Sequence, residues 1–171
     1  MRKSLLAACV LLVGCGADNS LGGSVSELFP LGISNVEVLR NDFAIQVTYY
    51  ANRGTFLDVV ARVVVSTSLL DGGTVDMSRP VTINLAGESS PGHQITSVAH
   101  APGGEATRNF PNVKNGDMNL FEIGAENKPT RGNFSMAFDT KGGDLGQGRT
   151  LLGTFAVSRT KDAGFGDPPP P

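Results

Sequence analysis

The sequence predicts an all-β domain, either an antiparallel β-sandwich or a small β-barrel of about eight or nine strands. Three observations lead to this prediction. Apolar and polar residues alternate over short segments, as in strands whose successive side chains point to opposite faces. Turn-forming residues separate these segments at intervals of roughly 8–15 residues. No stretch of the chain shows sustained helical spacing.

The first predicted strands form a hairpin that is followed by a central strand. Val36–Arg40 and Phe43–Tyr50 flank the turn-forming pair Asn41-Asp42. In Asp58–Thr67, apolar and mostly β-branched residues occupy most of both faces. This pattern is typical of a strand in the middle of a sheet.

The middle of the chain contains shorter segments with weaker patterns. Val81–Leu85 alternates regularly and predicts a strand, whereas Gln94–His100 is out of phase and predicts a bulge or an edge strand. Thr107–Phe110 is expected to be short and extended. Asn115-Gly116 is a strong turn signal, so we expect a turn there and a strand over Met118–Ile123.

The last hairpin has the clearest alternation. Its strands each place three large apolar residues on one face: Phe134, Met136 and Phe138 on the first, and Leu151, Phe155 and Val157 on the second. Glycine inside a strand often marks a bend or a close backbone approach. Gly132 and Gly153 are therefore expected where these strands curve.

The N-terminus has the order of a secretory signal. Arg2 and Lys3 precede the apolar run Leu5–Val13, and small residues follow it. The run is too short to span a bilayer, which needs ~20 helical residues. The alternative is a buried N-terminal helix, but such a helix normally carries polar residues on one face, and this run has none.

The segment Leu12-Val13-Gly14-Cys15 resembles the lipobox of bacterial lipoproteins. The resemblance implies cleavage between Gly14 and Cys15 and attachment of a diacylglyceryl group to the Cys15 thiol. Two or three acyl chains hold a protein durably on a membrane, so the expected partner is the membrane itself. Gly16 rather than Asp follows the cysteine, which in such lipoproteins favours delivery to the outer membrane. The expected location is the cell envelope.

The rest of the chain is loosely similar to uncharacterised bacterial lipoproteins with β-sandwich domains, and this similarity implies no activity. We divide the chain into a signal peptide (residues 1–14), a flexible tether (15–24), a β domain (25–160) and a proline-rich disordered tail (161–171). A turn of helix fits the sequence near Ser24–Phe29.

Composition excludes some classes of function. The chain carries 14 Lys and Arg and 16 Asp and Glu, for a net charge of −2, and its basic residues do not cluster. A nucleic-acid partner is therefore not expected. Removal of the signal would take away Cys9 and leave Cys15 alone, so no disulfide can form within the mature chain.

The sequence offers no strong metal, cofactor or catalytic site. The only histidines, His93 and His100, are seven residues apart and would lie on opposite faces of a regular strand. The acids near the glycine-rich turns lack the order of a calcium loop and are interpreted as solvated loop residues: Asp117, Asp139 and Asp144. Ser89 and Ser90 lie near His93, but no G-x-S-x-G elbow is present. We expect no enzyme activity, no metal and no cofactor.

Tyr49, Tyr50, Arg53 and Phe56 offer a weak binding candidate, because aromatic and arginine side chains are enriched at interfaces. The preferred interpretation is a hairpin loop with one tyrosine buried. The favoured function is a lipid-anchored, non-catalytic envelope protein that binds a protein partner or an envelope component. The alternatives are a carrier of an apolar ligand inside a barrel, lined by Phe134, Phe138 and Phe155, and a cell-wall hydrolase.

Overall fold

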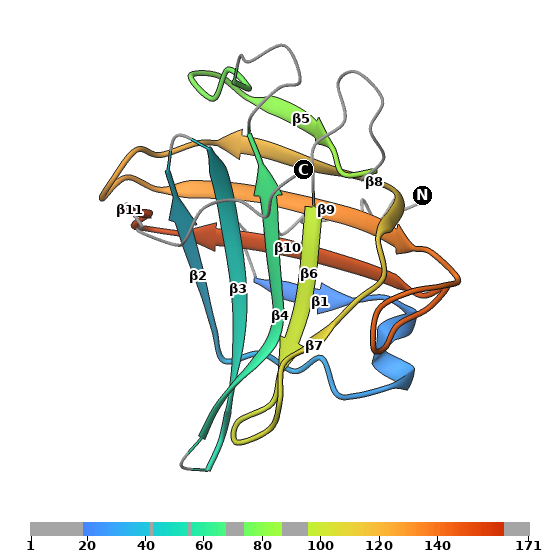
Figure 1. The fold of residues 1–171 in the computed structure, drawn as a ribbon. Helices are drawn as coiled ribbons and strands as arrows, with labels where there is room; N and C mark the ends of the chain where they lie inside the picture. The colour runs from blue at the N-terminus through green and yellow to red at the C-terminus, as the bar shows by residue number, and fades with distance from the viewer. Residues whose placement is uncertain (1–18, 42, 55, 68–73, 87–95, 163–171) are drawn as a thin grey trace, which may run out of the picture.

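The protein is a sandwich of two β-sheets that does not close into a barrel (Figure 1). The structure, a computed structural model, describes residues 19–41, 43–54, 56–67, 74–86 and 96–162. One sheet has five strands in the order β1-β10-β9-β8-β5, and the other has six in the order β11-β2-β3-β4-β6-β7. The strands of one sheet run across those of the other (Figure 1). The all-β prediction is confirmed, and the sandwich is the form that it takes.

Within the described residues, eight strands have four or more residues and three are shorter, where the sequence predicted about eight or nine in all. The longer strands are β2 (Asn35–Arg40), β3 (Ala44–Arg53), β4 (Phe56–Ser66), β5 (Val81–Asn84), β6 (Thr96–Ala101), β8 (Val113–Glu122), β9 (Thr130–Phe138) and β10 (Thr150–Val157). The short ones are β1 (Ser20–Gly22), β7 (Arg108–Asn109) and β11 (Lys161–Asp162). A 3₁₀ helix, η1 (Ser24–Glu27), follows β1 where a turn of helix fitted the sequence.

The core lies between the inner faces of the two sheets. Alternation in β3 and β4 directs Val47, Tyr49 and Val63 inward, each with no exposed surface. From the other sheet, Phe134 packs edge-on against Tyr49, with ring centroids 6.1 Å apart. Phe138 stacks on Phe110 at 4.6 Å. The aromatic residues that were candidates for lining a carrier cavity therefore fill the core, and the barrel on which that hypothesis depended is not formed.

The predicted turn at Asn115-Gly116 is wrong, because both residues lie inside β8. The ladder with β9 shifts register between Val113 and Asn115, so the irregularity in the sequence appears as a bulge. A Cβ on Gly116 would meet the side chain of Met136 at 2.9 Å and the backbone of Ser135 more closely still. The glycine is thus required by the close approach of β9 and not by a turn.

Both predicted ends of the β domain are corrected by short strands. Ser20–Gly22, which we placed in the tether, pairs with β10 as β1. Lys161–Asp162, which we placed in the tail, pairs in parallel with β2 as β11. Each pairing depends on a partner more than a hundred residues away in the sequence, so local patterns could not predict it.

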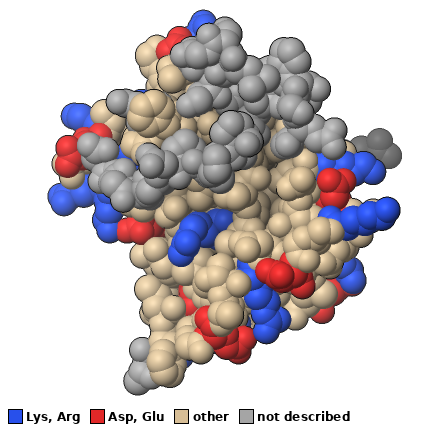
Figure 2. All heavy atoms as spheres, in the orientation of Figure 1, with Lys and Arg blue, Asp and Glu red and all other residues tan. Residues whose placement is uncertain are grey.

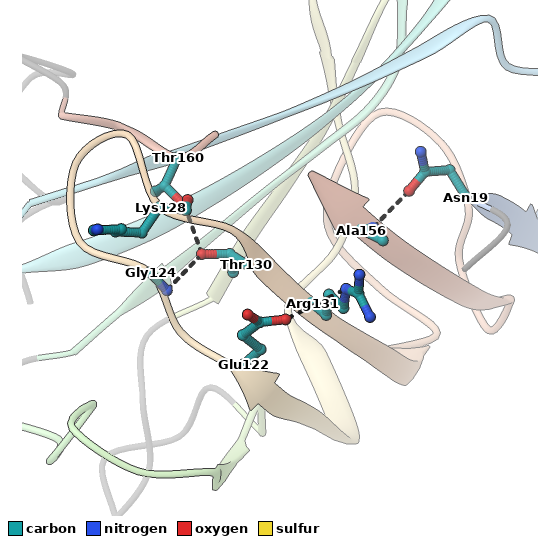
Figure 3. A network of polar contacts seen from close by, with 8 residues as sticks. All are labelled: Asn19, Glu122, Gly124, Lys128, Thr130, Arg131, Ala156 and Thr160. Carbon is teal, nitrogen blue, oxygen red and sulfur yellow. Dashed lines mark hydrogen bonds and ion pairs between the residues drawn. The ribbon is translucent and has the colours of Figure 1, made fainter. Parts of the chain in front are cut away.

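Side-chain hydrogen bonds secure these ends (Figure 3). Asn19 Oδ1 accepts a hydrogen bond from the Ala156 N–H at 2.6 Å, just ahead of β1. At the point where the chain leaves the five-stranded sheet for β11, the Thr160 hydroxyl lies 2.6 Å from that of Thr130. Thr160 also donates to the Lys128 carbonyl at 2.9 Å. The chain segment between β10 and β11 is thereby fastened to the β8–β9 turn.

Candidate binding pocket

A pocket of about 490 Å³ lies where four separate segments meet at one end of the sandwich. These segments are the residues just after η1, the end of the β3–β4 hairpin, the β6–β7 connection and the β9–β10 loop. The pocket has an apolar part and a polar part. Its polar lining residues are Arg53, His100, Glu105, Arg108, Asp144 and Gln147.

His100 and Phe29 lie together in the lining of the pocket. Their rings stack with centroids 3.9 Å apart and an interplanar angle of 13°. His100 is buried, with 7% of its surface exposed, and its Nδ1 lies 2.9 Å from the Val60 carbonyl oxygen. Because a carbonyl can only accept, Nδ1 carries the proton in this contact.

A bulge in β4 makes this contact available. In the β3–β4 ladder Tyr49 pairs with Ala61 and Tyr50 pairs with Val59, which leaves Val60 as the extra residue. The extra residue is left out of the ladder. No local pattern in the sequence predicts this bulge, and the spacing of the two histidines places His100 only on the opposite face of a strand from His93.

Arg53 reaches the pocket from the end of β3 and is held by Asp58. The Arg53 Nε lies 2.8 Å from Asp58 Oδ2, and Asp58 is only 4% exposed. The Gly103 N–H donates to the other carboxylate oxygen at 2.5 Å. Half of the Arg53 side chain remains exposed. The buried carboxylate therefore orients the guanidinium and also ties the β3–β4 hairpin to the loop after β6.

Asp144 reaches the pocket from the glycine-rich β9–β10 loop. Its Oδ2 accepts a hydrogen bond from the Asn109 N–H at 2.8 Å, and its own N–H donates to the Asn109 carbonyl at 2.7 Å. The loop packs closely at Gly146, whose φ is +79° and where a Cβ would lie 2.5 Å from the Phe110 ring. The loop is thus docked on Asn109 of β7 and on Phe110, which follows β7.

Arg108 and Glu105 form an exposed ion pair with an N···O distance of 3.2 Å. The two amide N–H groups of Gln147 face the Gly142 and Gly143 carbonyl oxygens at 3.1 and 3.3 Å. Acidic and basic side chains are also interspersed over the face shown in Figure 2, with no broad area of one sign. The pocket therefore combines donors and acceptors without a strong charge.

The predicted binding residues do not form one surface. Tyr49 has no exposed surface, and its hydroxyl donates to the Thr154 carbonyl at 3.0 Å, across the sandwich. Burial raises the Tyr49 pKa far above its ordinary value. Of the four candidates, only Arg53 lines the pocket, and Phe56 is exposed outside its lining. The preferred sequence interpretation was a hairpin loop with one tyrosine buried: Tyr49 is buried, but both tyrosines lie within β3 and not in a loop.

Tyr50 belongs to a polar cluster on the outer face of the six-stranded sheet. Its hydroxyl donates to Glu37 Oε2 at 3.0 Å, and Lys161 of β11 pairs with the same carboxylate. The Glu37 pKa is lowered, mainly by the hydrogen bond from Lys161. Burial acts in the opposite direction and raises this pKa, and the hydrogen bond from Tyr50 lowers it further. Burial, followed by the bond to Glu37, raises the Tyr50 pKa.

Other predicted site residues give no further cluster. Gly14, Cys15, Ser89, Ser90 and His93 lie outside the described residues. Within the described ranges, no group of three or more His, Cys, Asp or Glu side chains could hold a metal ion. A second pocket of about 510 Å³ is lined by Arg40, Asp76 and six other residues.

Sequence reasoning missed most of the pocket. Glu105, Arg108 and Gln147 carry no local motif, and Asp144 was interpreted as a solvated loop residue. The signal that reveals them is their convergence from distant segments, which requires the fold. Among the residues that the structure describes, no helix has the length and apolar character needed to cross a membrane. Comparison of the chain with protein-family models, with curated proteins and with solved structures gives no significant match.

Proposed function

We propose that this chain is a lipid-anchored, non-catalytic protein of the cell envelope that binds a protein partner or an envelope component. The observation that carries the proposal is the segment Leu12-Val13-Gly14-Cys15 after a basic and apolar N-terminus. Gly16 after the cysteine favours the outer membrane, as stated above for lipoproteins of this type.

The position of the first strand supports the proposal. Four residues lie between Cys15 and Ser20, where β1 begins, so the chain makes five residue-to-residue steps from one to the other. An extended chain covers at most ~3.5 Å per residue, so a lipid on Cys15 would hold β1 within about 18 Å of the bilayer surface. A domain held so close to a membrane is well placed to meet molecules that are part of the envelope.

The charged groups in the pocket are suited to orienting a ligand. The described contacts pair Arg53 with Asp58 and Arg108 with Glu105, and one oxygen of Asp144 accepts a hydrogen bond from a backbone N–H. Each of these side chains is held in place by its partner and keeps further donor or acceptor positions for a ligand.

The test is membrane fractionation with protease treatment of intact cells, comparing the wild type with Cys15→Ala. We expect the wild type to float with the outer membrane and to incorporate labelled palmitate, and Cys15→Ala to do neither. Cys9→Ala is the matched control, because it alters the other cysteine and should leave both readouts unchanged. If Cys15→Ala fractionates and labels like the wild type, the anchor proposal is wrong.

A further inference from the structure

The lining of the pocket has no net charge. The lining contains two arginines, Arg53 and Arg108, and two acids, Glu105 and Asp144, while Arg53 is also paired with Asp58 outside the lining. A ligand that carries a single charge would therefore meet groups of both signs and gain little from long-range attraction. The chemistry of the pocket favours a ligand that is polar but uncharged.

Donors and acceptors both remain available in the lining. Arg53 and Arg108 each have further N–H groups, because a guanidinium carries five. Asp144 and Gln147 each offer an acceptor to a ligand. Asp144 offers its second carboxylate oxygen, because the first one is bonded to the Asn109 N–H. Gln147 offers its amide oxygen, because its amide nitrogen faces two loop carbonyls. In the neutral form of His100, Nε2 is the acceptor, since Nδ1 donates to Val60.

A hydroxyl group both donates and accepts, so it can use such a mixed lining at every position. The apolar part of the pocket, formed by Phe29 and Leu145 with Leu28 at 46% exposure, offers a surface for C–H groups. Its volume of about 490 Å³ falls within the usual range of small-ligand sites, ~300–1,000 Å³. Together these features match a molecule that carries many hydroxyls around an apolar ring face.

We propose that the pocket binds a neutral carbohydrate, a mono- or disaccharide unit of an envelope glycan. This inference deepens the proposed function by giving the chemical class of the bound component, and it rests on that function for the place where the glycan is met. The rival ligand is a zwitterionic peptide end, whose carboxylate would pair with an arginine and whose ammonium group would pair with Asp144.

The test is calorimetric titration of the purified full chain in a sugar-free detergent. The neutral probes are N,N′-diacetylchitobiose, cellobiose and maltose at millimolar concentration. Glycylglycine and inorganic phosphate represent the zwitterionic and anionic alternatives. We expect at least one disaccharide to bind, and neither glycylglycine nor phosphate to do so.

Two variants test whether the disaccharide binds in this pocket. Arg108→Ala removes a donor, and Asp144→Asn keeps an acceptor for the Asn109 N–H while changing the group that faces the ligand. Each should weaken disaccharide binding by about tenfold, as expected when a hydrogen bond to a charged group is lost. Arg131→Ala is the matched control, because Arg131 is also paired with a glutamate and is 56% exposed, against 54% for Arg108, but does not line the pocket.

Three outcomes would overturn the proposal. None of the disaccharides binds; glycylglycine or phosphate binds in their place; or Arg131→Ala weakens disaccharide binding as much as Arg108→Ala does, with thermal unfolding midpoints unchanged in both. The titration uses purified protein, so its result does not depend on the lipid anchor. Fractionation can therefore disprove the anchor proposal without affecting the carbohydrate proposal, and titration can disprove the carbohydrate proposal without affecting the anchor proposal.

Discussion

The ring of Phe134 lies over Gly153, its direct partner on β10, so closely that a Cβ on Gly153 would be 2.5 Å from two ring atoms. The same relationship recurs two positions along the ladder with the strands exchanged. Phe155 of β10 faces Gly132 of β9, where a Cβ would lie 2.6 Å from its ring. Each glycine therefore provides the space that a neighbouring aromatic ring fills in the core.

We predict that Gly153→Ala destabilises the fold by about 1–3 kcal/mol, because the added methyl overpacks against Phe134 and against the Tyr49 hydroxyl at 2.8 Å. Urea unfolding measures the change. Gly22→Ala is the control, since a Cβ at Gly22 on the adjacent strand β1 meets nothing within 4 Å. Equal stability of the two variants would contradict the close packing at Gly153.

Tyr49→Phe should cost about 1 kcal/mol, because it removes the hydrogen bond from the buried hydroxyl to the Thr154 carbonyl between the two sheets. The comparison is Tyr50→Phe, whose hydroxyl bonds to Glu37 on the outer face, where water can replace it. We expect a smaller loss there in the same unfolding assay. The reverse order would show that the bond across the sandwich is not the stronger one.

Stability should fall in alkali because the Tyr49 pKa is raised in the folded state. Below the pKa of the unfolded chain, about 10, Tyr49 is protonated in both states and titration changes nothing. Above it, the unfolded chain loses a proton that the folded chain retains, so the free energy of unfolding decreases. Urea midpoints at about pH 8 and about pH 11 measure this loss. Tyr49→Phe should reduce the loss without abolishing it, because the Tyr50 pKa is also raised.

Stability should also fall in acid through Glu37, whose pKa is lowered mainly by the hydrogen bond from Lys161. The contribution is present above the pKa of the unfolded chain, about 4.3, and is lost as the pH falls through the lower pKa of the folded state. Glu37→Gln should flatten this part of the pH profile of urea midpoints, and Lys161→Met should do the same. If the urea midpoint of Lys161→Met falls in acid as much as that of the wild type, the contact of Lys161 in β11 is not the cause of the lowered Glu37 pKa.

Asp58→Ala should destabilise the fold by about 1–3 kcal/mol, because it leaves the Gly103 N–H without its acceptor and Arg53 without its partner. Asp76→Ala is the control, because Asp76 is exposed where it pairs with Arg79 and bonds to Ser78, and water can replace these contacts. Thermal unfolding of both variants decides between these expectations.

The regular strands were predictable because side-chain alternation is a local property. The hairpin of Val36–Arg40 with Phe43–Tyr50 is β2 and β3, and the last predicted hairpin is β9 and β10. Asn115-Gly116 shows the limit of local evidence. The pair has a strong intrinsic preference for a turn, but its pairing with β9, together with the hydrogen bond from the Leu85 N–H to the Gly116 carbonyl, holds it in a strand.

By itself, the sequence determined the all-β class, the main hairpins, the inward face of Phe134, Met136 and Phe138 in β9, and the lipobox resemblance. Only the tertiary structure decided between sandwich and barrel, added β1 and β11 to the sheets, and brought Arg53, His100 and Asp144 to one pocket. The physical reason is the distance along the chain over which each feature is determined. Alternation is set by neighbouring residues, whereas strand pairing and the pocket come from contacts between segments that are far apart in the chain.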